Sequence, residues 1–519
     1  MNHRIKEIIA FDDNSRVRLI IEAFVVGILS GIVIVAYRWC LKAASNCLHL
    51  IIEATQDNVL LIGVWFLILG IMAYLVSLLV TKEPLISGSG IPQLEAELTG
   101  HLSTKWYRVL INKFIGGFLA LFAGLSLGRE GPSIQLGAML GKGISKTLNR
   151  SKNEERYLMT CGASAGLAAA FHAPLAGVMF AIEEVHKQFS IALLLAVMTS
   201  SLTADYFISA ILGMEPIFDF TITRSFTPDF FPILIVLGVI LGFGGVIYNS
   251  SLLKIQKMYS HPSLNQFKKL LIPFMLAGVI AYTFPILLGG GDAIIEQLNV
   301  ANFATTSLIV ILIGKLLFSL ISFNSGAPGG IFFPMLVLGS IIGKIAANIA
   351  VNNFGIDPIY VDNFIIVAMA GLFSSIVKAP VTGIILIFEM TGSLTSLLAI
   401  SFVSIVSFIV SEICRSKPIY DSLLENLLKR NCDFEYQKNL ADDKVLQTFF
   451  VHNDSPIASK KIKELMWPEN VLLVSIKRGH HEIIPNGNTV VEVNDRLLVI
   501  CNVEQQSTTY DYLLLLTSS

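Results

Sequence analysis

The sequence Gly128-Arg129-Glu130-Gly131-Pro132-Ser133 lies inside an apolar run that begins near Leu119 and reaches Leu140. Two full charges in such a run are costly, because a charge at the centre of a bilayer costs about 3 kcal/mol or several times that, depending on the scale. The glycines and the proline indicate an interrupted backbone, so that a helix begins at membrane depth. Since the start of a helix offers free N–H groups and a positive dipole end, the stretch predicts a membrane protein that handles anions, with Glu130 as the controlling residue.

The composition is typical of a polytopic helical membrane protein. The chain of 519 residues is 54% hydrophobic and 14% charged, with a mean hydropathy of +0.68, whereas a soluble protein carries about 25% charged residues. We therefore expect an all-α membrane domain, anchored by its first apolar stretch rather than led by a removed signal peptide. Stretches long enough to span a bilayer, about 20 residues, are 17–36, 60–81, 107–127, 189–213, 231–253, 270–288, 305–323 and 395–413.

Charged residues on the loops predict the orientation in the membrane. Basic residues gather at the N-terminus and in 142–156, 254–269 and 415–429, which we expect in the cytoplasm. The loops 53–58 and 215–229 are mostly acidic, and we expect them outside. Both termini are then cytoplasmic. The net charge of −1 implies no global electrostatic partner such as a nucleic acid polymer.

The composition changes near Tyr420, beyond which apolar runs shorten to strand length. We expect a membrane domain over 1–420, a linker over 421–440 and a small soluble α+β domain over 441–519. The expected elements of the soluble domain are a short helix over 458–466 and strands over 471–476, 482–484, 489–491 and 496–501.

Two segments of the membrane domain resemble each other. GREGPSIQLGAMLGK over 128–142 and GIFFPMLVLGSIIGK over 330–344 share six of fifteen positions at an offset of 202 residues. Internal repeats with interrupted helices are typical of secondary transporters, so we expect two repeated halves, about 17–213 and 229–416. Further matches at slightly larger offsets are Ala173-Pro174 with Ala379-Pro380, and Glu183 with Glu389.

Three segments combine glycines with a proline: GSGIP over 88–92, GREGP over 128–132 and GIFFP over 330–334. In each, the proline fits the first turn of a helix, where no hydrogen bond is lost, and the glycines let the backbone bend and approach a ligand. One such motif alone favours a re-entrant kink. Three in one chain, two of them related by the repeat, predict convergence on one site.

In this order and spacing, the three motifs resemble the CLC family of chloride channels and proton-coupled chloride antiporters. A fourth element, Lys417-Pro418-Ile419-Tyr420, follows the last expected membrane helix, and the resemblance covers about residues 15–425. It implies a homodimer in the lipid bilayer, in which each subunit has its own anion pathway built from two inverted halves.

The resemblance assigns the chloride site to hydroxyl and backbone donors. It implies that Ser89 and Tyr420 donate their hydroxyls to a central chloride, and that the backbone N–H groups of Ile331 and Phe332 face this ion. Neutral donors replace hydration without trapping the ion. In the family, serine at the position of Ser89 goes with chloride and proline goes with nitrate, and the fluoride-exporting branch departs from both GSGIP and GREGP. Chloride is therefore the expected ion.

Glu130 matches the gating glutamate of the family, and Gly131 beside it is a supporting residue. A carboxylate at an anion-binding helix end can occupy the anion site when ionised and swing away when protonated, which couples proton occupancy to chloride occupancy. The alternative is a structural ion pair with Arg129, which we consider weaker because adjacent residues on a helix point in different directions.

Three further charged residues match family positions. Glu184 matches the internal proton-transfer glutamate of the antiporters, which the channels typically lack, and Glu95 resembles a buried carboxylate near it. Lys113 matches a buried lysine that we expect to be structural. For Glu183 we expect an ordinary position at a helix end facing water, after an apolar helix over Gly162–Ile182.

Other chemistries find no support in the sequence. The six cysteines form no metal-ligand spacing, and GAMLGK over 137–142 has the wrong length and no Ser or Thr for a phosphate-binding loop. No catalytic Ser/His/Asp arrangement is visible, and His172 is expected to be packed within an apolar helix. We therefore expect neither an enzyme nor a cofactor or metal.

The C-terminal region, about 445–505, resembles the RCK-C or TrkA-C module of potassium-uptake subunits. This resemblance implies dimerisation and a small ligand, in some bacterial members a cyclic dinucleotide (c-di-AMP), which would lie near His480, Ile484 and Pro485. The alternative is a module that stabilises a dimer and binds no ligand.

Together these observations predict a chloride/proton antiporter of a bacterial cell membrane. One alternative is a passive gated chloride channel, against which Glu184 argues. A second alternative is a ligand sensor whose membrane part is regulated by the C-terminal domain.

Overall fold

A computed structural model describes residues 3–187, 190–213, 218, 220, 222, 224–260, 264–300, 303–392, 394–431, 444–452, 455–465, 467, 471–478, 481–502, 512–513 and 516–517. The chain divides into two compact units, Met1–Glu425 and Asn426–Ser519. Each has its own hydrophobic core.

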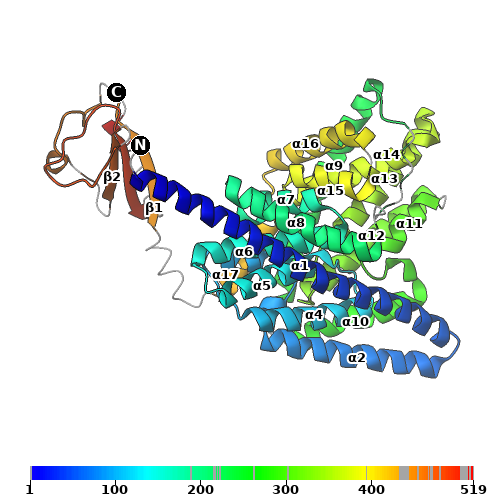
Figure 1. The fold of residues 1–519 in the computed structure, drawn as a ribbon. Helices are drawn as coiled ribbons and strands as arrows, with labels where there is room; N and C mark the ends of the chain where they lie inside the picture. The colour runs from blue at the N-terminus through cyan, green and yellow to red at the C-terminus, as the bar shows by residue number, and fades with distance from the viewer. Residues whose placement is uncertain are drawn as a thin grey trace. The chain divides into compact units, whose positions relative to one another are not determined.

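The first unit is helical (Figure 1). Seven helices of the described chain are long and apolar enough to cross a membrane, which makes this a multi-pass membrane protein. Its helices are α1 (His3–Thr55), α2 (Val59–Lys82), α3 (Ile91–Leu98), α4 (Trp106–Phe122), α5 (Glu130–Thr147), α6 (Lys152–Phe171), α7 (Pro174–Phe180), α8 (Ile191–Leu212), α9 (Phe231–Tyr259), α10 (Gln266–Thr283), α11 (Asp292–Val300), α12 (Thr305–Asn324), α13 (Phe332–Phe354), α14 (Val361–Val377), α15 (Pro380–Thr391), α16 (Leu397–Ile413) and α17 (Ile419–Asn431).

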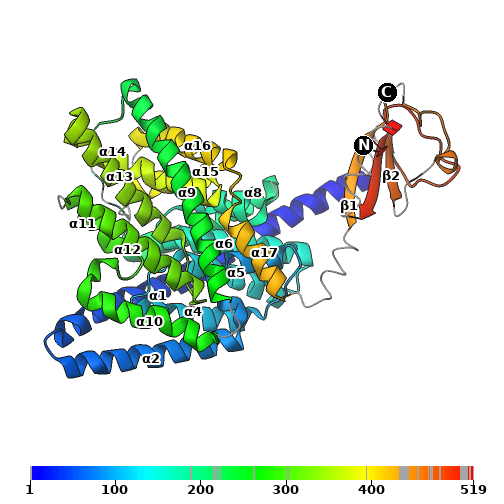
Figure 2. The same ribbon diagram turned by 180° about the vertical axis from the view of Figure 1, so that it is seen from behind.

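The helices separate into an outer and an inner set. In α2 only 28% of the most apolar window is buried, and in Figures 1 and 2 it lies beside α10 on one flank of the unit. For α13 and α14 the corresponding values are 67% and 78%. The expected spans omitted both inner helices, whose most apolar windows have a hydropathy of 1.7, compared with 2.7 for α2. The glycine and serine residues of these two helices serve packing against protein rather than contact with lipid.

The expected continuous helix Gly162–Ile182 is wrong. Helix α6 ends at Phe171, and α7 begins at Pro174. A proline removes a helical hydrogen bond and disfavours the helical conformation of the residue before it. His172 therefore lies at the break, in a left-handed conformation with φ of 50°, and its Nδ1 is 3.4 Å from the Asp205 carboxylate.

The second half of the chain has the same kind of helix break before a proline. Helix α14 ends at Val377 before Lys378, which has a φ of 67°, and α15 begins at Pro380. Helix α5 packs on α6 as α13 packs on α14. The α5–α6 approach requires glycine, since a Cβ on Gly137 would collide with the backbone of Gly162. The structure thus repeats the elements that the two aligned segments predict.

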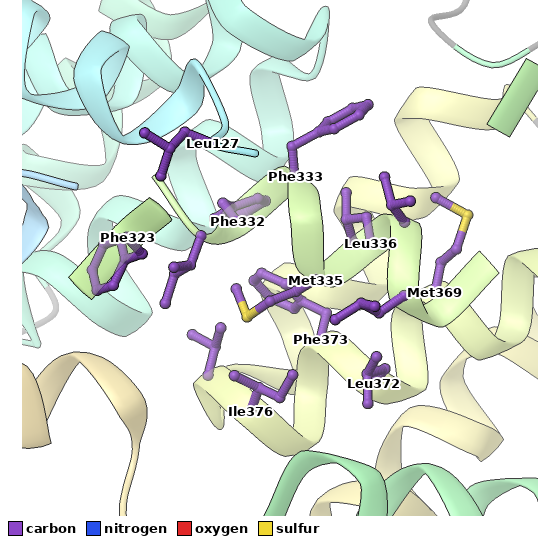
Figure 3. Packing of buried hydrophobic residues seen from close by; sticks show 14 of the residues in the cluster. Leu127, Phe323, Phe332, Phe333, Met335, Leu336, Met369, Leu372, Phe373 and Ile376 are labelled. Atoms are coloured by element: carbon purple, nitrogen blue, oxygen red, sulfur yellow. The ribbon is translucent and has the colours of Figure 1, made fainter. Parts of the chain in front are cut away.

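The core of this unit surrounds the start of α13 (Figure 3). The Phe332 ring lies 5.3 Å from that of Phe171, 6.0 Å from that of Phe180 and 4.7 Å from that of Phe373. Such tilted and edge-on contacts are favourable for aromatic pairs. The first turn of α13 is therefore held rigidly among side chains from several helices.

The second unit contains an antiparallel four-stranded sheet in the order β1-β4-β2-β3, formed by β1 (Lys444–Phe450), β2 (Leu472–Arg478), β3 (His481–Ile483) and β4 (Arg496–Asn502). Strand β1 pairs with β4 from Lys444↔Asn502 to Phe450↔Arg496. The Arg478 guanidinium bonds the buried Asp495 carboxylate at 2.8 Å, which raises the pKa of Arg478 and ties β2 to the turn before β4.

Several expected elements of this unit need correction. The helix over 458–466 is wrong, since only Ile462–Glu464 form a single 3-10 turn, and strand β1 was not expected. Segment 459–463 instead bonds segment 487–491 through its backbone, as in Ile462 N–H to Thr489 O at 3.0 Å, so the expected strand over 489–491 is reduced to one isolated bridge. The segment expected as a linker, 421–440, begins inside α17, and residues 432–440 lie outside the described ones.

Candidate functional site

The three Gly/Pro segments meet at one place in the first unit. Gly128 and Gly330 exchange two backbone hydrogen bonds, of 2.7 and 2.8 Å, and Gly329 N–H donates to Gly88 O at 2.9 Å. The starts of α3, α5 and α13 follow directly from these contacts. The N-termini of three helices, each with unpaired N–H groups, therefore adjoin a single junction.

Gly131 allows this approach. A Cβ at this position would lie 2.8 Å from the Ser89 carbonyl oxygen and 2.9 Å from the Ser89 Cβ. A Cβ at Gly330 would likewise lie 3.1 Å from the Gly131 nitrogen. Side chains here would push the three helix starts apart, which gives Gly131 a physical reason to be glycine.

Glu130 is the first residue of α5 and is only 1% exposed. Its Oε2 has no hydrogen-bond partner among the described residues, while the Phe333 backbone amide interacts with the carboxyl group. The Arg129 Nε lies 3.9 Å from Glu130 Oε1, and the same guanidinium lies 3.9 Å from Asp292. The ion pair that we considered as an alternative is present, but at a distance too long for a hydrogen bond.

Two buried hydroxyls have unused donor capacity. Ser89 is 2% exposed and accepts from Ile91 N–H at 3.3 Å, so its own proton is free to donate to a ligand. Tyr420, the second residue of α17, is fully buried, and its hydroxyl meets no partner in the described part of the chain. Tyr420 lies within electrostatic reach of both Glu130 and Glu184. A buried donor left unpaired costs about 1–3 kcal/mol, so this hydroxyl is suited to an acceptor from outside the chain.

Ile331 and Phe332 can act through their backbone alone. Ile331 is the N-cap of α13 and Phe332 its first residue, and both side chains are fully buried. Since the Phe332 ring is occupied by aromatic packing, only the N–H groups remain for a ligand.

A second set of carboxylates gathers around Lys187. Glu184 lies in the turn Ala181–His186, is 5% exposed, and has an Oε1 without a described partner. Glu95 on α3 is equally buried and contacts the Lys187 ammonium, which also bonds Asp421 at 2.6 Å. The predicted neighbours Glu95 and Glu184 thus share one electrostatic environment. Lys187 and Asp421 were missed, because no local pattern distinguishes them.

The expected role of Glu183 at a water-facing helix end needs correction. Its carboxylate accepts from Thr382 N–H at 2.8 Å and from the Thr382 hydroxyl at 2.7 Å, and so caps the start of α15. Glu389 in turn accepts from Leu175 N–H at 3.0 Å and Ala176 N–H at 2.8 Å at the start of α7. The two halves cap each other reciprocally, and the Glu183/Glu389 match was the signal for it.

Buried lysines repeat in the same way. Lys113 donates to the carbonyls of Ile86 and Gly88 at 2.8 and 2.7 Å, and Lys315 donates to those of Leu287 and Gly289 at 3.0 and 2.7 Å. Both lysines satisfy carbonyl groups in segments that turn between helices. This geometry agrees with a structural role for Lys113, and the offset of 202 could have identified Lys315.

In the C-terminal unit, the structure describes only part of the expected ligand site. Ile484 is 86% exposed and Pro485 follows it, whereas His480 lies outside the described residues. Across the described ranges, no group of three or more His, Cys, Asp or Glu residues could hold a metal ion.

Comparisons with known proteins identify relatives of both units. Residues 72–412 match the family described as voltage gated chloride channel, and residues 446–514 match the TrkA-C domain. The H(+)/Cl(-) exchange transporter ClcA of Vibrio parahaemolyticus is 33% identical over 427 residues, which cover 80% of this chain and 90% of the relative. The protein of the same name in Salmonella typhimurium is 32% identical over 436 residues, which cover 82% and 92%.

Solved structures share the fold. A slow cyanobacterial Cl-/H+ antiporter matches with a TM-score of 0.76 at 32% identity, covering 80% of this chain and 99% of that chain. A CLC-type fluoride/proton antiporter matches with a TM-score of 0.65 at 22% identity, covering 78% and 97%, which is a likeness of fold alone. The family match includes Ser89, Glu130 and Glu184 and ends before Tyr420.

Proposed function

The chain belongs to the voltage-gated chloride channel family, and on this premise we propose that it exchanges chloride for protons across a bacterial cell membrane. The observation that carries the proposal is the burial of the Glu130 carboxyl at the junction of three helix starts, where the next residue, Gly131, packs against Ser89. Chloride binds there between Ser89, Tyr420 and the N–H groups of Ile331 and Phe332.

Glu130 links the two ions at this junction. In its ionised form the carboxylate is stabilised by the N–H groups and dipole of α5, and it competes with chloride for the same donors. In its protonated form it loses this attraction and leaves the donors to chloride. Since one side chain binds the proton and competes with chloride, the movement of chloride is coupled to the movement of protons.

Exchange is favoured over a passive channel by the second set of carboxylates. Glu184 is a buried acid away from the helix junction, and one of its oxygens is unpartnered within the described structure. It gives protons a route that chloride does not share. The relatives that cover most of the chain are also named exchange transporters.

The test is proton uptake driven by chloride. Purified protein in liposomes loaded with chloride is diluted into low-chloride buffer, and external pH is followed while a potassium ionophore clamps the voltage. Exchange moves protons inward as chloride leaves, and Glu130→Gln removes proton movement while chloride efflux continues. Chloride efflux without proton uptake by the unaltered protein would establish a channel instead.

The assembly is a homodimer with both termini in the cytoplasm. The sheet of the C-terminal unit supports pairing of two copies, since several large apolar side chains of its strands are exposed: Leu446, Phe450, Leu472 and Val474. A cyclic dinucleotide, c-di-AMP, binds between two such units near His480, Ile484 and Pro485. Calorimetric titration of the purified protein with c-di-AMP tests this, and absence of heat would leave a dimer-stabilising module without a ligand.

A further inference from the structure

Lys187 joins two elements that are distant in the sequence. It follows the turn Ala181–His186 in a left-handed conformation, with φ of 55°. Its ammonium contacts Glu95 on α3 and Asp421 on α17. We call these two ion pairs the Lys187 bridge.

The bridge ends on the elements that carry the two hydroxyl donors. Glu95 lies in α3, whose N-terminus directly follows Ser89 and Gly90. Asp421 is adjacent to Tyr420 in the first turn of α17. A shift of the Lys187 ammonium would therefore change the positions of both hydroxyls, those of Ser89 and Tyr420, at the proposed chloride site.

The bridge also lies beside the candidate proton carrier. Glu184 stands three residues before Lys187, within the turn Ala181–His186, and the charges of Lys187, Asp421 and Glu95 all act on it. A proton that arrives at Glu184 neutralises one of the three carboxylates whose charges act on this ammonium, and leaves the two that contact it. The balance of attraction that holds Lys187 between α3 and α17 then changes.

We propose that Lys187 is a positioning residue that transmits the protonation state of Glu184 to the chloride donors, by tying Glu95 on α3 to Asp421 on α17. The inference rests on the proposed exchange of chloride for protons. Lys187 itself contacts neither the chloride site nor the transferred proton; it acts through the two carboxylates it holds.

The bridge differs from the buried lysines that satisfy backbone carbonyl groups. The Lys187 side chain is 38% exposed and its ammonium is held by side chains rather than by the carbonyl groups that hold Lys113. Exposed ion pairs contribute little to stability. The Glu95 side chain is only 6% exposed, however, so removal of the ammonium leaves a buried carboxylate uncompensated beside Glu184.

The experiment compares substitutions of Lys187 in the full-length protein in liposomes. Lys187→Met is expected to lower the number of protons moved per chloride at least about twofold, with chloride flux retained, and Lys187→Arg to restore most of the coupling. Lys378→Met is the matched control, because Lys378 is also a left-handed lysine after a helix and is paired with Glu412 at 2.5 Å. It should leave coupling unchanged.

A second variant keeps the proposal testable if Lys187→Met does not fold. Asp421→Asn breaks the other end of the bridge and should lower coupling similarly, and the double variant should be no worse than either single one. If the unaltered protein exchanges protons and both variants match the control, the inference fails and the proposed function stands. If the unaltered protein moves chloride without protons, the proposed function fails and takes this inference with it.

Discussion

Glu130 experiences opposing effects at the start of α5. Burial at 1% exposure disfavours its ionised form, whereas the helix start favours it. The same residue type has a different task at Glu183 and Glu389, where each carboxylate accepts two hydrogen bonds from a helix start and is held in place. Oε2 of Glu130, by contrast, has no hydrogen-bond partner among the described residues, so this carboxyl group is not used as a cap.

Glu184→Val is expected to abolish proton movement while chloride transport continues. The reason is that valine removes a buried acid outside the helix junction but leaves Ser89, Glu130 and the N–H donors in place. Paired recordings of chloride efflux and proton uptake in liposomes measure both. Retained coupling in this variant would indicate a different proton route.

Tyr420→Phe is expected to weaken chloride binding by about 1.5–3 kcal/mol, a loss of about tenfold or more in affinity, because it removes one hydrogen bond to a charged ligand. Isothermal titration of chloride into purified protein measures the change. Tyr282→Phe is a suitable control, since the Tyr282 hydroxyl pairs with Thr55 at 2.7 Å. Equal affinities in all three proteins would remove Tyr420 from the site.

At the scale of elements, the broken helices depend on partners from the other half. Helices α7 and α15 each begin at a proline after a break, and each start is capped by a glutamate on the opposite helix or the turn that follows it. A cap supplied by a distant segment joins the two repeats as well as ending a helix.

Glu183→Gln and Glu389→Gln are expected to destabilise the membrane unit by similar amounts, about 0.5–2 kcal/mol each. Glutamine keeps the shape of the side chain but loses the charge that complements the helix dipole and one acceptor oxygen. Thermal unfolding in detergent, followed by size-exclusion chromatography, gives the comparison. A large effect at one position and none at the other would contradict reciprocal capping.

At the scale of the whole molecule, the two units have separate cores. The core of the C-terminal unit is built by residues such as Phe449, Ile476, Leu497 and Val499, and that of the membrane unit by residues from its own helices. A unit that buries its own apolar core can fold without the other.

Deletion of residues 436–519 is therefore expected to leave a folded protein that still exchanges chloride for protons. The truncated and full-length proteins are compared in the same liposome assay at equal protein density, with and without c-di-AMP. Nucleotide should affect only the full-length protein. If the truncated protein elutes from size-exclusion chromatography as a folded protein but has lost all chloride flux, the result supports the alternative in which the C-terminal domain regulates the membrane part.

The sequence by itself determined the class of protein, the repeat and the residues at the helix starts. Hydropathy and the Gly/Pro motifs depend on local chemistry: an apolar run needs lipid or a core, and a proline fits the first turn of a helix, as at the starts of α3, α7 and α15. Ser89, Glu130 and Gly131 lie at the predicted junction because their own neighbours break the backbone there.

Only the tertiary structure decided which charges meet. Lys187 contacts Glu95, which is 92 positions away in the sequence, and Asp421, which is 234 positions away. Glu183 accepts a hydrogen bond at the start of α15, almost 200 positions further along the chain. No local pattern encodes such pairs, because they arise when two interrupted halves pack against each other. The same packing placed the carboxylate of Glu183, which the sequence predicts to face water, at the start of a helix of the other half.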